Sequence, residues 1–169
     1  MRKLVFLVGT VLCTGCGAPA NSPEGAVENF FKALKRGDHV KASQYVNETY
    51  GGLEVLDAAF KSLETRSFMQ QIWAKTDYDV GQQEEVRGGA IIVPVRVSSP
   101  DLLAIIGAAS NFSFNSPSME EVRLRLEAED APTRQATLQI NVSQVDGRWK
   151  LWPSPELDAA LVGGTPALQ

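Results

Sequence analysis

The chain has 169 residues, of which 44% are hydrophobic and 21% are charged, and its formal net charge is −4. This composition excludes a disordered chain, a collagen-like chain and a protein with several membrane spans. The length predicts one domain. Both cysteines, Cys13 and Cys16, lie near the start of the chain, so we expect no disulfide and no cysteine-bound metal in the folded body.

The chain begins with a short basic segment, Met1-Arg2-Lys3, which is followed by an apolar run from Leu4 to Leu12. This run is too short to cross the hydrocarbon of a bilayer, which needs roughly 20 helical residues. The pattern is typical of a secretory signal peptide, which is removed from the mature protein.

The segment Leu12-Cys13-Thr14-Gly15-Cys16 resembles the lipobox of bacterial lipoproteins, although Cys13 stands where that family usually has an aliphatic residue. The resemblance implies cleavage before Cys16 and attachment of a lipid with palmitate-type acyl chains to its thiol. Two or three such chains would hold a domain on a membrane almost permanently. The alternative is a plain secreted protein that is cut after Ala18-Pro19-Ala20.

These features divide the chain into a signal peptide over 1–15, a tether over 16–22 and a single α+β domain over 23–169. Removal of the signal peptide takes away only two charges, Arg2 and Lys3, and leaves a net charge of −6. A net acidic chain lacks the electrostatic footprint of a nucleic-acid-binding protein. Its charge would not draw it to anionic lipids either, so the lipid on Cys16 must supply the anchor.

A Ser-Pro-acid pattern occurs three times, at Ser22, Ser99 and Ser154. Serine accepts hydrogen bonds from the first free amides of a helix, proline suits the first helical position, and an acid suits the positive end of the helix. The pattern therefore predicts three helix starts.

The first half of the chain, over about 23–74, is predicted to be helical. A first helix that ends at Gly37 and a second that Asp38 caps are followed by a third, which runs on or restarts through 68–73. The residues expected to face inward are Val27, Phe30, Phe31 and Leu34 on the first helix, Ala42, Tyr45 and Val46 on the second, and Leu53, Leu56, Phe60 and Leu63 on the third.

The second half is predicted to form an antiparallel sheet. A polar edge strand over 76–86 and a turn at Gly88-Gly89 lead to an alternating strand over 91–97, in which Pro94 indicates an edge position or a bulge. The clearest strand covers 136–142, and Asp146-Gly147 turns it into a last strand over 149–152.

Helical segments interrupt and end this sheet. We predict a capped helix over 100–109, a loop over 111–117 and a terminal helix over 156–161. The segment 119–129 has a capping box but also strand-like alternation, and we predict a helix there.

Three stretches resemble small bacterial lipoproteins of unknown function that have a nuclear-transport-factor-2-like (cystatin-like) domain: Ser22–Asp38, Asp146–Leu151 and Leu157–Gly164. The resemblance implies helices packed on a curved antiparallel sheet that forms a cone, with a helical insertion between strands. It also implies a cavity in the cone for a ligand or an active site.

Catalytic residues are hard to find in this chain. The only histidine, His39, is expected to be a solvated residue of the second helix, and no nucleophile elbow, phosphate loop or zinc spacing occurs. We therefore predict a protein that is not an enzyme and has no cofactor or metal. The alternative is an enzyme of the cone fold that uses carboxylates such as Asp77 or Asp79.

Two features favour binding. The helix over 100–109 is apolar nearly all round, so we expect it to be buried against the open face of the sheet, or else to form an exposed patch or lid. Tryptophans can line a pocket, although in strands they more often fill a core. The candidate ligand-binding residues are Trp73, Trp149, Trp152, Leu103, Ile106 and Phe112.

The sequence thus predicts a lipid-anchored, extracytoplasmic domain of the bacterial cell envelope. Its expected role is to bind a small apolar ligand or an envelope protein, with no nucleic acid as partner. A purely structural envelope lipoprotein is a further alternative.

Overall fold

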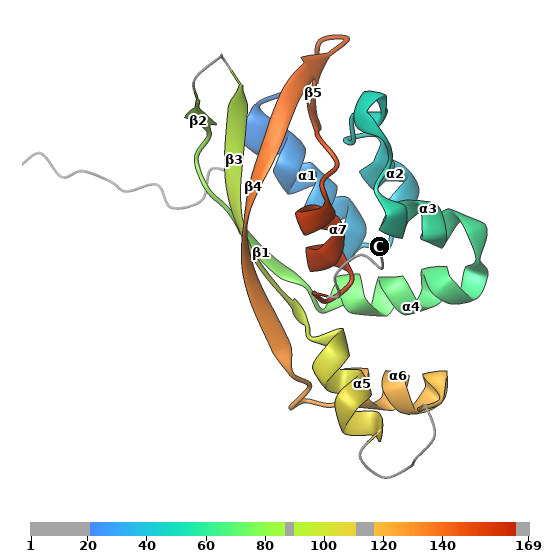
Figure 1. Ribbon diagram of the computed structural model, residues 1–169. Helices are drawn as coiled ribbons and strands as arrows, with labels where there is room; N and C mark the ends of the chain where they lie inside the picture. Colours follow the sequence, from blue (N-terminus) through green and yellow to red (C-terminus); the bar gives the residue numbers. More distant parts are fainter. Residues whose placement is uncertain (1–20, 87–89, 111–116, 165–169) are drawn as a thin grey trace, which may run out of the picture.

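The computed structural model describes residues 21–86, 90–110 and 117–164. It is a mixed α+β structure in which helices pack on a curled antiparallel sheet (Figure 1). The first half of the chain is helical, and two helices separate the two long strands of the second half. This arrangement confirms the predicted α+β class and the helical insertion between strands.

Helix α1 (Pro23–Lys35) begins and ends where the sequence predicts. The Ser22 hydroxyl accepts a hydrogen bond from the Gly25 amide at 3.0 Å. After the helix, Gly37 has a φ of 73°, which a residue with a side chain rarely adopts. All four apolar residues predicted to face inward are buried because they share one face of the helix: Val27, Phe30, Phe31 and Leu34.

The rest of the helical half consists of α2 (His39–Ser43), the 3-10 turn η1 (Glu48–Tyr50), α3 (Glu54–Lys61) and α4 (Leu63–Ala74). Asp38 caps α2 as predicted, since its carboxylate accepts a hydrogen bond from the Lys41 amide at 2.9 Å. The stripe predicted on the third helix is wrong in its second half, because Phe60 is 45% and Leu63 76% exposed. The backbone of Ser62 is extended, so Leu63 starts a new helix and does not continue the buried face of α3.

Within the described residues, the sheet contains five antiparallel strands in the order β1-β3-β4-β5, with β2 also paired to β3. Their bounds are β1 (Asp77–Val80), β2 (Glu84–Glu85), β3 (Ile91–Pro100), β4 (Thr133–Val145) and β5 (Arg148–Leu151). The polar segment predicted as one edge strand forms two short strands, β1 and β2, at that edge. The inward residues of the two long strands are buried as their alternation predicts: Val93, Val95, Val97, Leu138, Ile140 and Val142.

Pro94 does not lie in an edge strand, because β3 pairs on both sides and its register with β4 runs unbroken from Ile91 to Pro100. On the other side the register shifts by one residue beside Pro94, since Val80 pairs with Val95 but Glu84 pairs with Ile92, and this irregularity fits the predicted bulge. The Pro94 carbonyl accepts a hydrogen bond from the Gly81 amide at 2.8 Å. In an antiparallel sheet, the N–H and the C=O of one residue point toward the same neighbouring strand. The missing N–H of Pro94 therefore faces the interval between β1 and β2, where the ladder is interrupted.

Helices α5 (Leu102–Ser110) and α6 (Met119–Glu127) form the insertion between β3 and β4. The predicted cap at Ser99 is wrong, because Ser99 and Pro100 belong to β3. Asp101 caps α5 instead, through a hydrogen bond that its carboxylate accepts from the Ala104 amide at 3.0 Å.

Helix α6 confirms the choice of helix over strand. Its capping box is complete, since the Ser118 hydroxyl accepts a hydrogen bond from the Glu121 amide and the Glu121 carboxylate accepts one from the Ser118 amide. Val122 and Leu126, four residues apart, are buried, whereas Leu124 is 64% exposed. Apolar residues at this spacing share a helix face, so the apparent alternation is misleading.

The predicted hairpin and terminal helix are both present. Asp146 and Gly147 have φ angles of 51° and 74°, which match the two-residue turn expected between β4 and β5. The terminal helix α7 (Pro155–Leu161) is capped by Ser154, whose hydroxyl accepts a hydrogen bond from the Leu157 amide at 3.2 Å.

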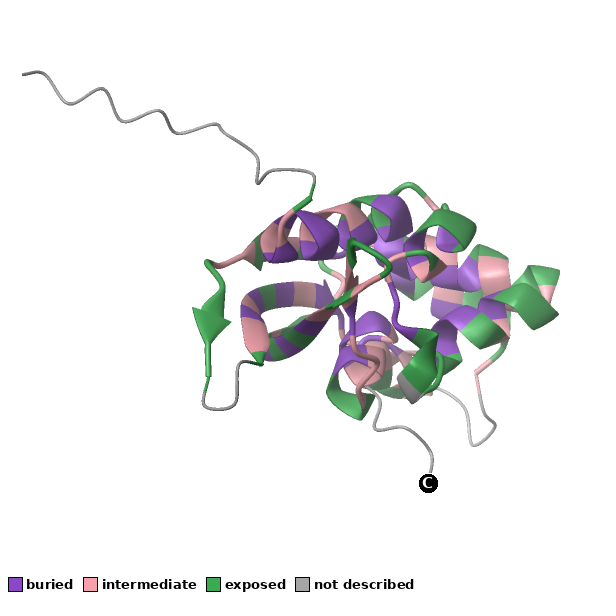
Figure 2. Cartoon of the chain, turned by 90° about the horizontal axis from the view of Figure 1, so that it is seen from above, coloured by how far each residue is buried: buried purple, intermediate pink, exposed green. Residues whose placement is uncertain are grey.

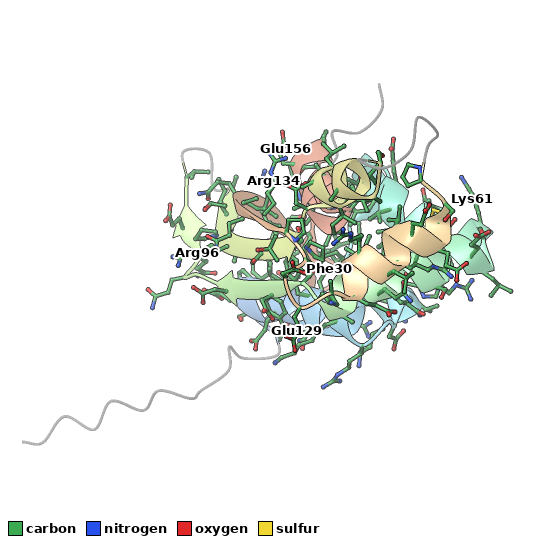
Figure 3. All side chains as sticks on the ribbon, turned by 90° about the horizontal axis from the view of Figure 1, so that it is seen from below. Phe30, Lys61, Arg96, Glu129, Arg134 and Glu156 are labelled. Atoms are coloured by element: carbon green, nitrogen blue, oxygen red, sulfur yellow. The ribbon has the colours of Figure 1, made fainter. Side chains whose placement is uncertain are left out.

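Side chains fill the space between the sheet and the helices. Helix α1 packs against β1, β3 and β5, and the buried residues lie on the faces of strands and helices that turn inward (Figure 2). Phe30 lies in the middle of the molecule, whereas Lys61 and Arg96 lie at its periphery (Figure 3). The concave side of the sheet is thus a packed core.

One carboxylate ties the end of the chain to the helical half. Asp158 of α7 accepts hydrogen bonds from the Glu54 and Val55 amides, at 3.1 and 3.2 Å, and so caps α3, whose own cap residue Leu53 has no suitable side chain. Burial raises the pKa of the Asp158 carboxyl, and this effect outweighs the two hydrogen bonds, which lower it.

The raised pKa of Asp158 has a consequence for stability. The folded protein binds the proton of the Asp158 carboxyl more tightly than the unfolded chain does. The contribution of Asp158 to the free energy of unfolding is therefore greatest at low pH, and it falls as pH rises through the pKa of the folded state. Asp158→Asn should remove this dependence. We expect denaturant unfolding to show wild type losing stability relative to Asp158→Asn as pH rises; a relative gain would contradict the assignment.

Candidate functional site

The structure does not bring the predicted ligand-binding residues together. Trp73 lies in α4, Trp149 in β5, Trp152 just after β5, and Leu103 and Ile106 in α5. Phe112, the Gly88-Gly89 turn and the lipid-attachment residue Cys16 lie outside the described residues.

Trp73 and Trp152 contact other parts of the protein and do not line the large surface cleft. Trp73 is 1% exposed and lines a void of about 10 Å³ beside Phe31 and Leu161, which is room for a single water. The buried Trp73 Nε1 has no hydrogen-bond partner among the described residues. Trp152 donates a hydrogen bond from Nε1 to the Ser143 hydroxyl at 2.8 Å.

Trp149 lines a surface cleft of about 460 Å³ that we call the hairpin cleft. It lies where the start of α1, the end of α2 and the turn between β4 and β5 meet. Its lining residues are Asn21, Ala26, Gln44, Tyr45, Gly147, Arg148 and Trp149.

Backbone hydrogen bonds hold the walls of the hairpin cleft in place. The Leu151 amide donates to the Tyr45 carbonyl and the Asn47 amide donates to the Leu151 carbonyl, both at 2.7 Å. These bonds clamp the segment after α2 to β5, next to Trp149. The Gly147 turn then presents Arg148 at the cleft.

The chemistry of the hairpin cleft is mixed. Tyr45 and Trp149 are half-buried rings, Arg148 is an exposed guanidinium, and Asn21 and Gln44 contribute amides. The guanidinium of Arg148 has no hydrogen bond or ion pair with any other residue that the structure describes. Such a surface suits a ligand with an anionic group and an apolar part.

Sequence reasoning found only Trp149 among these residues. The Asp146-Gly147 turn places Arg148 at the start of the last strand, but nothing local indicates that the end of α2 folds against that strand. Tyr45 was predicted to face inward and is half-buried, which is compatible with either a core or a cleft residue.

A second feature is the insertion, which we call the helical arm and define as α5 with α6. It lies at one end of the sheet and the hairpin turn lies at the other (Figure 1). The 13 residues of β4 connect the two ends, a distance of about 40 Å for an extended strand.

The helical arm exposes large apolar side chains. Helix α5 has no charged residue, yet Ile105 is its only buried one, and Leu103 is 51% exposed. Ile106 is half-buried, and α6 exposes Met119 (44%) and Leu124 (64%). The predicted burial of this helix against the sheet face is therefore wrong for most of its length, because α5 packs against α6 beyond the end of β3.

The two carboxylates considered for catalysis do not lie inside the curled sheet. Asp77 and Asp79 are exposed on β1, and Asp77 forms an ion pair with Lys35. Between them, Tyr78 stacks on Phe31 with ring centroids 5.0 Å apart, and burial raises the pKa of its hydroxyl.

His39 is not the solvated residue that we predicted. It is 7% exposed, and its ring packs 4.7 Å from that of Phe60. In the described part of the chain, no group of three or more His, Cys, Asp or Glu residues is placed to hold a metal ion. None of the described helices is long and apolar enough to span a bilayer.

Comparisons of the chain with protein-family models, with curated proteins and with solved structures found no match. The residues of the chain itself therefore define its class. They define an α+β fold with a curled antiparallel sheet, a mixed aromatic and cationic cleft at one end of that sheet and, at the other, a helical arm that exposes several large apolar side chains.

Proposed function

We propose that this protein is a lipid-anchored, extracytoplasmic domain of the bacterial envelope that binds a protein partner through the helical arm. The observation that carries the proposal is the exposure of Leu103, Met119 and Leu124 on an insertion whose first helix has no charge. Large exposed apolar side chains on two helices that pack against each other can form an interaction site. A partner with an apolar surface would cover them.

The lipid anchor is supported by the sequence before the domain. A short apolar leader precedes Leu12-Cys13-Thr14-Gly15-Cys16, and the cleavage that this lipobox implies would leave Cys16 at the mature N-terminus. Each buried methylene of an attached acyl chain contributes about 0.8 kcal/mol to membrane binding, so two or three chains hold the domain at the bilayer.

We also propose that the fold is of the nuclear-transport-factor-2-like type. The curled antiparallel sheet and the packing of α1 against β1, β3 and β5 support this assignment. The three stretches that resemble bacterial lipoproteins with this domain contribute α1, β5 and α7.

Binding is favoured over catalysis by the places of the carboxylates. The interior is lined by apolar side chains such as Phe30, Trp73 and Ile72, whereas Asp77 and Asp79 lie exposed on an edge strand. A small ligand inside the sheet is a weaker proposal for the same reason, since side chains occupy that space.

The proposal can be tested by photo-crosslinking in living cells. A photoreactive amino acid replaces Leu103, Leu124 or, as a control, Leu63, which is 76% exposed but lies in α4 outside the helical arm. We expect one discrete adduct from positions 103 and 124 and none from 63. Leu103→Glu should abolish the adduct formed from position 124.

Two results would contradict the proposed partner. Equal adducts from all three positions would indicate non-specific contact, and no adduct from either position of the helical arm would mean that nothing covers it. An adduct of twice the mass of the chain would identify the partner as a second copy.

A further inference from the structure

We propose that the hairpin cleft binds the headgroup of a phospholipid in the bilayer to which the chain is anchored. The phosphate would pair with Arg148, and the rings of Trp149 and Tyr45 would lie at the level of the headgroup. This inference rests on the proposed lipid anchor, and it concerns the end of the molecule opposite the helical arm.

The first argument is position. Asn21 lines the hairpin cleft, and it lies only five positions after Cys16 in the sequence. Five extended residues reach at most about 18 Å, so a lipid on Cys16 would keep the hairpin cleft within that distance of the bilayer surface. The helical arm, at the far end of β4, would then point away from the membrane.

The second argument is chemical complementarity. A guanidinium without a protein partner is suited to a phosphate, which it can bind with two parallel hydrogen bonds. Tryptophan and tyrosine favour the interface between headgroup and hydrocarbon because one end of each ring is polar and the rest apolar. Arg148, Trp149 and Tyr45 bring both properties to one cleft.

The third argument comes from net charge. The mature chain would carry a net charge of −6, so its overall field would not draw it to a membrane. The headgroup contact therefore orients an already anchored domain rather than recruiting it. A zwitterionic phospholipid should suffice, because the contact requires only the phosphate.

The test uses the acylated mature protein in phosphatidylcholine vesicles whose acyl chains carry bromine close to the headgroup. Bromine quenches tryptophan fluorescence at short range. We expect strong quenching in wild type, loss of most of it in Trp149→Phe and retention in the matched control Trp152→Phe. Arg148→Gln should reduce the quenching at least twofold, with the protein still bound to the vesicles.

The outcomes separate this inference from the anchor on which it rests. Protein that does not bind vesicles would overturn the anchor itself. Bound protein without quenching, or quenching that is equal in Trp149→Phe and wild type, would overturn the headgroup contact alone. Relief of quenching by excess soluble glycerol phosphate would identify a site for free anions and overturn the membrane assignment.

Discussion

Cys16→Ser is expected to abolish incorporation of a labelled palmitate analogue into the protein, because serine has no thiol to accept the lipid. The loss should be complete, since the resemblance to a lipobox assigns the lipid to Cys16 and not to the second thiol, Cys13. Deletion of two or three acyl chains removes tens of buried methylenes at about 0.8 kcal/mol each, which makes this the largest change we predict.

Cys13→Ser is the matched control for this experiment. It changes the same atom three residues earlier, and we expect it to leave labelling intact. Labelling lost in both variants would point to a general failure of export or processing. Labelling retained in Cys16→Ser would place the lipid elsewhere and contradict the assignment.

Gly163→Ala is expected to lower the free energy of unfolding by about 3 kcal/mol or more. Gly163 follows α7 with a φ of 78°, and an added Cβ would lie 2.3 Å from the Pro100 carbonyl oxygen. The Leu102 amide also donates a hydrogen bond to the Gly163 carbonyl at 3.3 Å. The backbone at Gly163 therefore packs against the first residue of α5, where the helical arm begins. Chemical denaturation followed by circular dichroism measures the loss.

Gly147→Ala provides the control, because Gly147 has a similar φ of 74° but no atom within 4 Å of the added Cβ. It should lose only the backbone preference, about 1 kcal/mol. The difference between the two variants isolates the steric contact with Pro100. Equal losses of stability in the two variants would contradict the close packing of Gly163 against Pro100.

Features with a local cause could be predicted from the sequence. The caps at Ser22, Asp38, Ser118 and Ser154 form hydrogen bonds within three residues, so their spacing alone specifies them. The turn at Asp146-Gly147 is equally local. The strands follow from alternation, because inward-facing residues of a half-buried strand must be apolar.

Features that depend on tertiary contacts could not be predicted in this way. Ser99 shares the Ser-Pro-acid pattern with two true caps, but β4 pairs with it through Arg134 and draws it into the sheet. His39 is buried because α3 brings Phe60 against it. The carboxylate that caps α3, Asp158, lies over a hundred residues away in the sequence.

The candidate sites show the same division. Hydrophobicity identified α5 but not its exposure, which follows from its place beyond the end of β3. The hairpin cleft requires Tyr45 and Trp149 to line the same space, and no spacing in the sequence indicates this. The resemblance to a lipobox could be found in the sequence because it rests on five consecutive residues, Leu12 to Cys16, and on no contact between distant parts of the chain.

The most direct test of the lipid anchor is the intact mass of the protein extracted from membranes. The result we predict is a chain that begins at Cys16 and carries the added mass of two or three acyl groups. A chain that begins at Asn21, or one that retains Met1 and has no added lipid mass, would contradict it.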